Sequence, residues 1–145
     1  MRILFVHQNF PGQYIHITQR LAQQGQHQLV ALAINPLDRG RGIPESLKHF
    51  RYRLARANTK GCHPLVLETE SKIIRAEACA RAAEQLRAKG FIPDLICAHP
   101  GWGEPLFLKA IWPDAPLLCY QEFFYNEFGF DSNFDPEFQD DRVWQ

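Results

Sequence analysis

The chain has 145 residues, which is enough for one domain with a hydrophobic core of its own. With 46% hydrophobic and 22% charged residues, it has the composition of an ordinary globular protein. Its 16 basic and 16 acidic residues give a formal net charge of zero, so no overall attraction to nucleic acid is expected. No apolar run approaches the roughly 20 residues that span a bilayer. No secretion signal or lipidation site is visible, and we expect a cytoplasmic protein.

The first apolar run, Ile-Leu-Phe-Val at residues 3–6, predicts a buried strand. An apolar run without alternation is typical of a strand covered on both faces in a parallel sheet, so we expect this strand at the centre. Polar residues 7–9 follow it, and a Pro11-Gly12 turn leads into a helical pattern at about Tyr14. Open α/β sheets bind ligands at this carboxyl edge, where we therefore expect function.

The remaining segments alternate between helix and strand patterns. We expect a helix with Tyr14, Ile17 and Leu21 on its buried face, ended by Gly25, and then a buried strand over 28–34. A loop over 38–44 and a half-exposed peripheral strand over 49–54 follow. The second half is expected to contain a helix over 69–89, a buried strand over 93–99, a helix over 106–111 and a last core strand over 115–120, and the long helix has Ile73, Ala76, Ala80, Ala83 and Leu86 on one face. This alternation implies right-handed crossovers and an α/β fold with a doubly wound, Rossmann-like parallel sheet.

The four cysteines are Cys62, Cys79, Cys97 and Cys119. None belongs to a Cys-x-x-Cys pair, and Cys97 and Cys119 lie inside strand-like apolar runs, so free thiols are expected rather than a disulfide framework or a zinc site. The histidines at positions 16, 27, 49 and 63 show no ligand spacing. We expect no metal and no cofactor in this domain.

Two stretches have an uneven charge. Seven basic residues lie between positions 39 and 60, and acidic residues dominate from Glu122 onward. The basic stretch suits a phosphorylated acceptor or an anionic membrane surface, and a solvated face is the alternative. We expect residues 1–130 to form the domain and residues 131–145 to be an acidic segment that leads toward a missing carboxyl-terminal domain.

Polar residues follow three of the expected strands: His7-Gln8-Asn9, then His99 with Gly101-Trp102-Gly103-Glu104, then Gln121-Glu122. In a parallel sheet these strand ends meet at one rim, although each set alone is explained by capping of its loop. The glycines allow backbone amides to approach an anion, but neither G-x-G-x-x-G nor a Walker-type motif occurs, so no classical dinucleotide or ATP site is expected. The aromatic run over 123–130 has two interpretations. It forms a hydrophobic wall for an acceptor or a partner domain, or it closes the core of this domain.

Three of these segments together carry a resemblance: residues 7–13, residues 94–104 and residues 118–125. They resemble the amino-terminal domain of GT-B glycosyltransferases, specifically a bacterial, family four-like subgroup of the large retaining family that includes sucrose synthase and mannosyltransferases. The resemblance implies an enzyme of two Rossmann-like domains that transfers a sugar to a hydroxyl acceptor with retention. It implies that the carboxyl-terminal domain binds most of the nucleotide-sugar donor and the amino-terminal domain binds the acceptor.

The resemblance also implies roles for particular residues. Gly12, followed by Gln13, occupies the place of the family's glycine in the first strand-to-helix loop, whose amides face the donor. His99 occupies the place of the histidine that contacts the transferred sugar, which makes it the candidate catalytic residue. Gly101 and Glu122 are the further candidates for donor or acceptor binding. The family's E-x7-E motif is absent from the sequence, so we expect half of an enzyme, inactive alone.

Two other classes remain open. The chain is alternatively a free-standing Rossmann-like binding or regulatory module, or half of a nucleotide-sugar epimerase with the same two-domain architecture. The length of the natural protein separates the first alternative from a transferase, and a product assay with and without acceptor separates the second. A peripheral contact with an anionic membrane, at the inner membrane surface, is a further expectation from the basic stretch.

Overall fold

The computed structural model describes residues 1–122. Its centre is a five-stranded parallel sheet in the order β3-β2-β1-β4-β5. The strands are β1 (Arg2–Val6), β2 (Gln28–Ala33), β3 (Lys48–Arg51), β4 (Leu95–Ala98) and β5 (Leu117–Cys119). The predicted α/β class and the central position of the first strand are both confirmed, as is the peripheral position of the alternating segment that forms β3.

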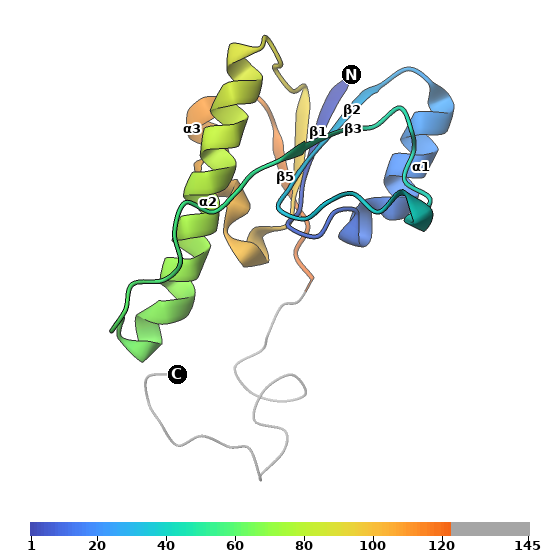
Figure 1. Ribbon diagram of the computed structural model, residues 1–145. Helices are drawn as coiled ribbons and strands as arrows, with labels where there is room; N and C mark the ends of the chain where they lie inside the picture. Colours follow the sequence, from blue (N-terminus) through green and yellow to red (C-terminus); the bar gives the residue numbers. More distant parts are fainter. Residues whose placement is uncertain (123–145) are drawn as a thin grey trace, which may run out of the picture.

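Helices cover both faces of the sheet (Figure 1). One face packs against α1 (Ile15–Gln24), and its core contains Ile3 and Phe5 of β1. The other face packs against α2 (Pro64–Ala88) and α3 (Leu108–Ile111), and its core contains Leu4 and Val6. Because successive residues of a strand point to opposite faces, the unbroken apolar run supplies both cores, and residues 3–6 are at most 3% exposed.

The helix boundaries and faces differ from the sequence-based expectation in detail. A 3₁₀ turn over Gly12–Tyr14 precedes α1, and Ile17, expected to be buried, is 48% exposed. The long helix α2 begins at Pro64 rather than at residue 69, because the His63 side chain accepts a hydrogen bond from the Leu65 amide and proline favours the first helical position. Its buried face includes Ile74 and Cys79 besides Ala76, Ala83 and Leu86.

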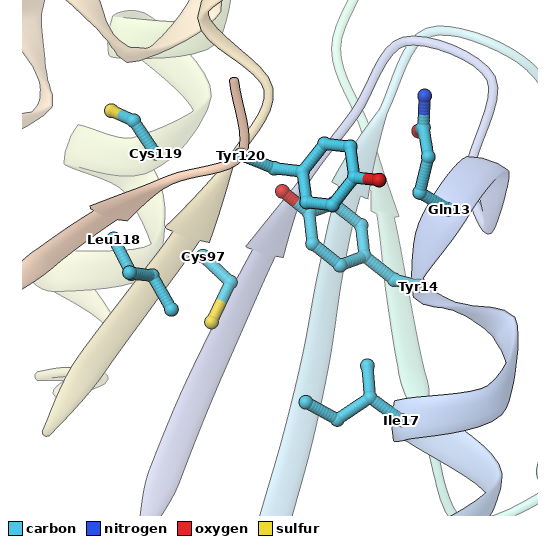
Figure 2. Close-up of a pocket in the computed structure, with 7 residues that line it drawn as sticks. All are labelled: Gln13, Tyr14, Ile17, Cys97, Leu118, Cys119 and Tyr120. Carbon is cyan, nitrogen blue, oxygen red and sulfur yellow. The ribbon is translucent and has the colours of Figure 1, made fainter. Parts of the chain in front are cut away.

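The last strand, β5, is an edge strand and is less buried than expected. Leu118 is 60% exposed, because no described element covers this end of the face that α1 covers elsewhere. An apolar pocket of about 300 Å³ lies there, between α1 and β5 (Figure 2). It is lined by Gln13, Tyr14, Ile17, Cys97, Leu118, Cys119 and Tyr120. All four cysteines of the chain are free thiols.

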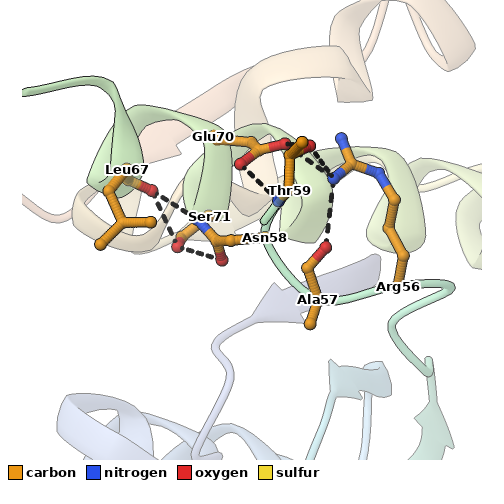
Figure 3. A network of polar contacts seen from close by, with 7 residues as sticks. All are labelled: Arg56, Ala57, Asn58, Thr59, Leu67, Glu70 and Ser71. Carbon is orange, nitrogen blue, oxygen red and sulfur yellow. Dashed lines mark hydrogen bonds and ion pairs between the residues drawn. The ribbon is translucent and has the colours of Figure 1, made fainter. Parts of the chain in front are cut away.

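Hydrogen bonds attach the segment between β3 and α2 to this helix, and most of them are accepted by the Glu70 carboxylate (Figure 3). Glu70 of α2 accepts hydrogen bonds from the Thr59 hydroxyl at 2.6 Å, the Thr59 amide at 2.9 Å and the Arg56 guanidinium at 2.7 Å. Ser71, one residue further, donates to Asn58 at 2.9 Å. Charge-assisted hydrogen bonds of this kind are among the stronger ones, so Glu70 is the main attachment of this segment.

We expect Glu70→Gln to lower the melting temperature at neutral pH and to weaken its acid dependence. The Thr59 hydroxyl, the Arg56 guanidinium and the Thr59 amide lower the pKa of Glu70 from 4.5 to about 2. Because the folded-state pKa is depressed, this stabilisation is complete above about pH 4.5 and is lost as the pH falls toward about 2. Thermal melts between pH 7 and 2 measure the effect, and Glu84→Gln on the exposed side of α2 is the control. Equal acid slopes in wild type and Glu70→Gln would show that the attachment contributes nothing.

Candidate functional site at the carboxyl edge of the sheet

The polar residues that follow β1, β4 and β5 meet at one rim, as the sequence predicts. The imidazoles of His7 and His99 lie edge to face, with 5.5 Å between ring centroids. Nε2 of His99 lies 3.0 Å from Oε2 of Glu122, an ion-pair distance, although its N–H is not aligned with that oxygen as a hydrogen bond requires. The Gln13 amide donates a hydrogen bond to the other oxygen of Glu122. Three strand ends therefore contribute to one cluster.

The two histidines are held in the same way by their own loops. Nδ1 of His7 accepts the Asn9 amide at 3.0 Å, and Nδ1 of His99 accepts the Gly101 amide at 3.2 Å. An Nδ1 that accepts a hydrogen bond carries no proton, so the neutral ring carries its proton on Nε2. Each imidazole is therefore fixed as an Nε2–H donor.

A glycine makes room for each of these rings. A Cβ added to Gly12 would lie 2.7 Å from Nε2 and Cε1 of His7, and one added to Gly101 would lie 2.8 Å from Cε1 of His99. Gly12 also has a φ of +48°, a conformation that side chains with a Cβ rarely adopt. The expectation that the amides of this turn face the donor stays a prediction; the structure shows that the space beside Gly12 is bounded by the His7 ring.

The charges of the cluster are set by burial and by its neighbours. Burial, and then the nearby His99, lower the pKa of His7, while Glu122 acts in the opposite direction. The contact with His99 and the hydrogen bond from Gln13 lower the pKa of Glu122. At neutral pH the cluster therefore combines an uncharged His7 with an ionised Glu122.

A polar pocket of about 460 Å³ opens beside this cluster, lined by His7, Asn9, Gly12, Gln13, Arg41, Trp102 and Glu122. His99 is only 5% exposed and does not line the pocket; the Glu122 carboxylate lies against its Nε2. Trp102, which is 40% exposed, stacks on His99 with ring centroids 6.2 Å apart. The pocket therefore offers hydrogen-bond donors, one carboxylate, one guanidinium and an aromatic surface.

Four pocket residues were not singled out as sites from the sequence: His7, Asn9, Arg41 and Trp102. Arg41 belongs to the basic stretch, where no periodicity shows which of seven basic side chains turns toward the rim. His7 was expected at the rim only as part of a polar run. Like His99, His7 directly follows a buried strand and has a glycine shortly after it in the sequence. This shared pattern is the sequence signal that could have identified His7 as a site residue.

Glu104, expected at the rim, instead points into the core. Its side chain is 1% exposed and accepts a hydrogen bond from the Tyr52 hydroxyl at 2.7 Å. The preceding Gly103, with φ at +99°, lies so close to α2 that a Cβ would be 2.4 Å from the Lys72 carbonyl oxygen. This close contact turns the chain inward after Trp102, and Glu104 therefore has a structural position.

Some of the expected features lie outside the described residues: the aromatic run over 123–130 and the acidic segment over 131–145. Within residues 1–122 there is no group of three or more histidine, cysteine, aspartate or glutamate side chains arranged for a metal ion. In the same part of the chain, no helix has the length and apolar character needed to cross a membrane.

The parallel sheet is of Rossmann-like type, and its polar pocket lies at the carboxyl edge, where open α/β sheets bind ligands. The chain belongs to the Glycosyl transferase family 4 group, whose family model matches residues 25–144. The resemblance carried by the rim motifs is therefore confirmed at the level of the family.

A solved structure, that of apo UGT2 from Phytolacca americana, has a similar fold, with a TM-score of 0.55 and 15% sequence identity. The match covers 82% of this chain and 28% of the UGT2 chain, so this chain corresponds to less than a third of that protein. At this identity the likeness concerns the fold alone. No curated protein matches the chain.

Proposed function

We propose that this chain is the acceptor-side domain of a two-domain glycosyltransferase that moves a sugar from a nucleotide-sugar donor to a hydroxyl acceptor with retention. The observation that carries the proposal is the cluster of His99, Glu122 and Gln13 at the edge of a polar pocket, in a domain of glycosyl transferase family 4. The carboxyl-terminal domain of the same enzyme is the second partner, and it holds the nucleotide and most of the diphosphate.

His99 is the group that we assign to the transferred sugar. Its Nδ1 is occupied by the Gly101 amide, so only Nε2–H is available as a donor. We assign to a sugar hydroxyl the place in line with this N–H, next to the Glu122 carboxylate that lies 3.0 Å from Nε2 in this structure. Gln13, which donates to the same carboxylate, then lies beside the bound sugar as a second donor.

The chemistry asked of this domain is positioning rather than proton transfer. Cleavage of the bond between sugar and diphosphate develops positive charge on the sugar ring, in an oxocarbenium-like transition state, and negative charge on the leaving diphosphate. A fixed N–H donor on a sugar hydroxyl holds the ring in place, and preorganised groups around the developing charges lower the barrier. Stabilisation of the departing diphosphate falls to the carboxyl-terminal domain.

The proposal is tested by assaying the full-length protein and residues 1–145 with a panel of UDP-sugars and GDP-sugars. We expect acceptor-dependent release of nucleoside diphosphate from the full-length protein, none from residues 1–145, and a product whose anomeric NMR coupling matches that of the donor. A new free sugar or epimer without acceptor would support the epimerase alternative. Robust transfer by residues 1–145 alone would contradict the half-enzyme proposal. No turnover of any donor by the full-length protein would favour the binding module.

We also propose a peripheral contact with an anionic membrane at the cytoplasmic side, through the first turns of α2. This helix extends past the carboxyl edge of the sheet (Figure 1), and its Leu65, Val66 and Leu67 are 67%, 50% and 46% exposed. The exposed Lys60 precedes them, and a basic residue near such a surface contributes about 1 kcal/mol. Sedimentation with phosphatidylglycerol vesicles should pull down wild type and leave Leu65→Ser/Leu67→Ser in solution. Equal sedimentation of the two would argue against this contact.

A further inference from the structure

One cation of the polar pocket has no part in the proposed transfer chemistry. Arg41 lines the pocket, and within residues 1–122 its side chain has no hydrogen bond and no ion pair. Its neighbour Arg39 has a structural use, since its guanidinium donates to the Pro44 carbonyl at 2.9 Å. Two arginines of one short loop are therefore used differently, and the one without a partner faces the pocket.

The loop that carries Arg41 is held in place on both sides. At its start, the Asp38 carboxylate accepts the Gly40 amide at 3.0 Å. At its end, the Gln19 side chain of α1 donates to the Gly42 carbonyl at 2.9 Å. Ile43, next in the chain, is 5% exposed and belongs to the core under α1. The backbone of Arg41 is thus positioned at the rim by contacts that do not involve its own side chain.

The charges around the pocket leave room for a negative group on the ligand. His7 is uncharged, and the carboxylate of Glu122 is engaged by Gln13 and His99 at the β4 and β5 side. Arg41 lies in the loop after β2, on the opposite side of β1 from β4 and β5 in the strand order. A guanidinium pairs preferentially with phosphate or carboxylate, which it contacts through two parallel N–H groups.

We propose that Arg41 determines acceptor specificity by binding a phosphate or carboxylate group on the acceptor, whose reactive hydroxyl then lies toward His99 and Glu122. This inference rests on the proposed function, because only that function makes the ligand a sugar acceptor. The binding of an anion at Arg41 is nevertheless measured without turnover. The donor diphosphate is the other source of such an anion, and the experiment separates the two.

The binding experiment uses the full-length protein with NMR detection of the arginine Nε–H signals and of the indole N–H signal of Trp102, which lines the same pocket and is present in every variant. The probes are inorganic phosphate, glucose 6-phosphate, glucuronate, glucose and UDP, each titrated into wild type, Arg41→Ala, Arg41→Lys and the control Arg20→Ala, an exposed arginine on α1 outside the pocket. We expect phosphate, glucose 6-phosphate and glucuronate, but not glucose, to shift the Arg41 signal. Arg41→Ala should weaken the binding of these anions about tenfold or more, and Arg41→Lys should keep part of it.

Several results of these titrations would contradict a role of Arg41 in acceptor binding. An Arg41 signal that neither phosphate, glucose 6-phosphate nor glucuronate shifts would overturn the proposal, as would equal losses of anion binding in Arg41→Ala and Arg20→Ala. A loss confined to UDP would assign Arg41 to the donor and also overturn it. Where transfer is measurable, Arg41→Ala should raise KM for anionic acceptors and spare neutral ones. Failure of all transfer would contradict the proposed function while the NMR shifts still decide the role of Arg41.

Discussion

Replacing His99 by alanine in the full-length protein is expected to lower kcat/KM about a hundredfold or more. One fixed hydrogen bond that holds the sugar ring in its reacting position is worth about that factor, because a misplacement of about 1 Å costs about 10²-fold in rate. The Nδ1 of His99 is held by the Gly101 amide and its ring is stacked on Trp102, so Nε2–H has a defined direction before substrate binds. Because the loss concerns the transition state, it should appear in kcat as well as in kcat/KM.

The alanine variant alone does not separate catalysis from folding. His99 is 5% exposed, and its removal leaves the Gly101 amide without an acceptor, which costs about 1 kcal/mol of stability. Two further variants resolve this. In His99→Asn the amide oxygen takes the place of Nδ1, so the loop is kept and the Nε2 donor is lost. In His99→Gln the amide nitrogen reaches the place of Nε2, so a donor is kept while the loop loses its acceptor.

Activity and stability should therefore follow different orders in these variants. We expect His99→Gln to retain more kcat/KM than His99→Asn, and His99→Asn to melt closer to wild type than His99→Gln. Melting temperatures and steady-state rates on the same preparations test both orders. If His99→Asn transfers sugar at nearly the wild-type rate, His99 has no catalytic role and serves only to cap its loop.

Much of the fold follows from short apolar runs. Residues 3–6 and 29–34 are apolar without alternation, as expected of strands covered on both faces, and this placed β1 and β2 inside a parallel sheet. The alternation around Phe50 correctly predicted an edge strand. The strand ends then determine the rim, because all parallel strands finish at the same edge. Local patterns were sufficient for these features.

Features that depend on contacts between distant elements were not predictable in this way. The helix α2 is rich in alanine, so two neighbouring faces of it are almost equally apolar in the sequence. In the structure α2 packs against residues 104–107 as well as against the sheet, and Ile74 and Cys79 are buried. Ile17 and Leu118 are apolar residues of α1 and β5, but the two elements leave a pocket between them. The position of Arg41 depends on how its loop is attached to α1, which no local pattern records.

The second large effect is expected at Gly12, where an added methyl group would meet the ring of His7. Gly12 and Gly25 both have left-handed φ values, +48° and +66°, so alanine at either position costs about 1 kcal/mol of backbone strain. At Gly25 nothing lies within 4 Å of the added Cβ, whereas at Gly12 the His7 ring lies 2.7 Å away. Gly25→Ala is therefore a matched control in which only the backbone strain is present.

We expect Gly25→Ala to lose about 1 kcal/mol of unfolding free energy and no activity, and Gly12→Ala to lose a further 1–3 kcal/mol or so from overpacking. His7 is 6% exposed and lies against both His99 and Tyr14, so its ring moves only by disturbing one of them. Displacement toward His99 should lower kcat/KM at least about tenfold, because a misplacement of about 1 Å near the reacting groups has effects of that size or larger. Denaturant unfolding gives the stability difference, and the NMR signals of the His7 and His99 rings report the displacement. If Gly12→Ala matches Gly25→Ala in unfolding free energy, in rate and in its histidine signals, the space beside Gly12 is not needed by His7, and the role assigned to this turn is wrong.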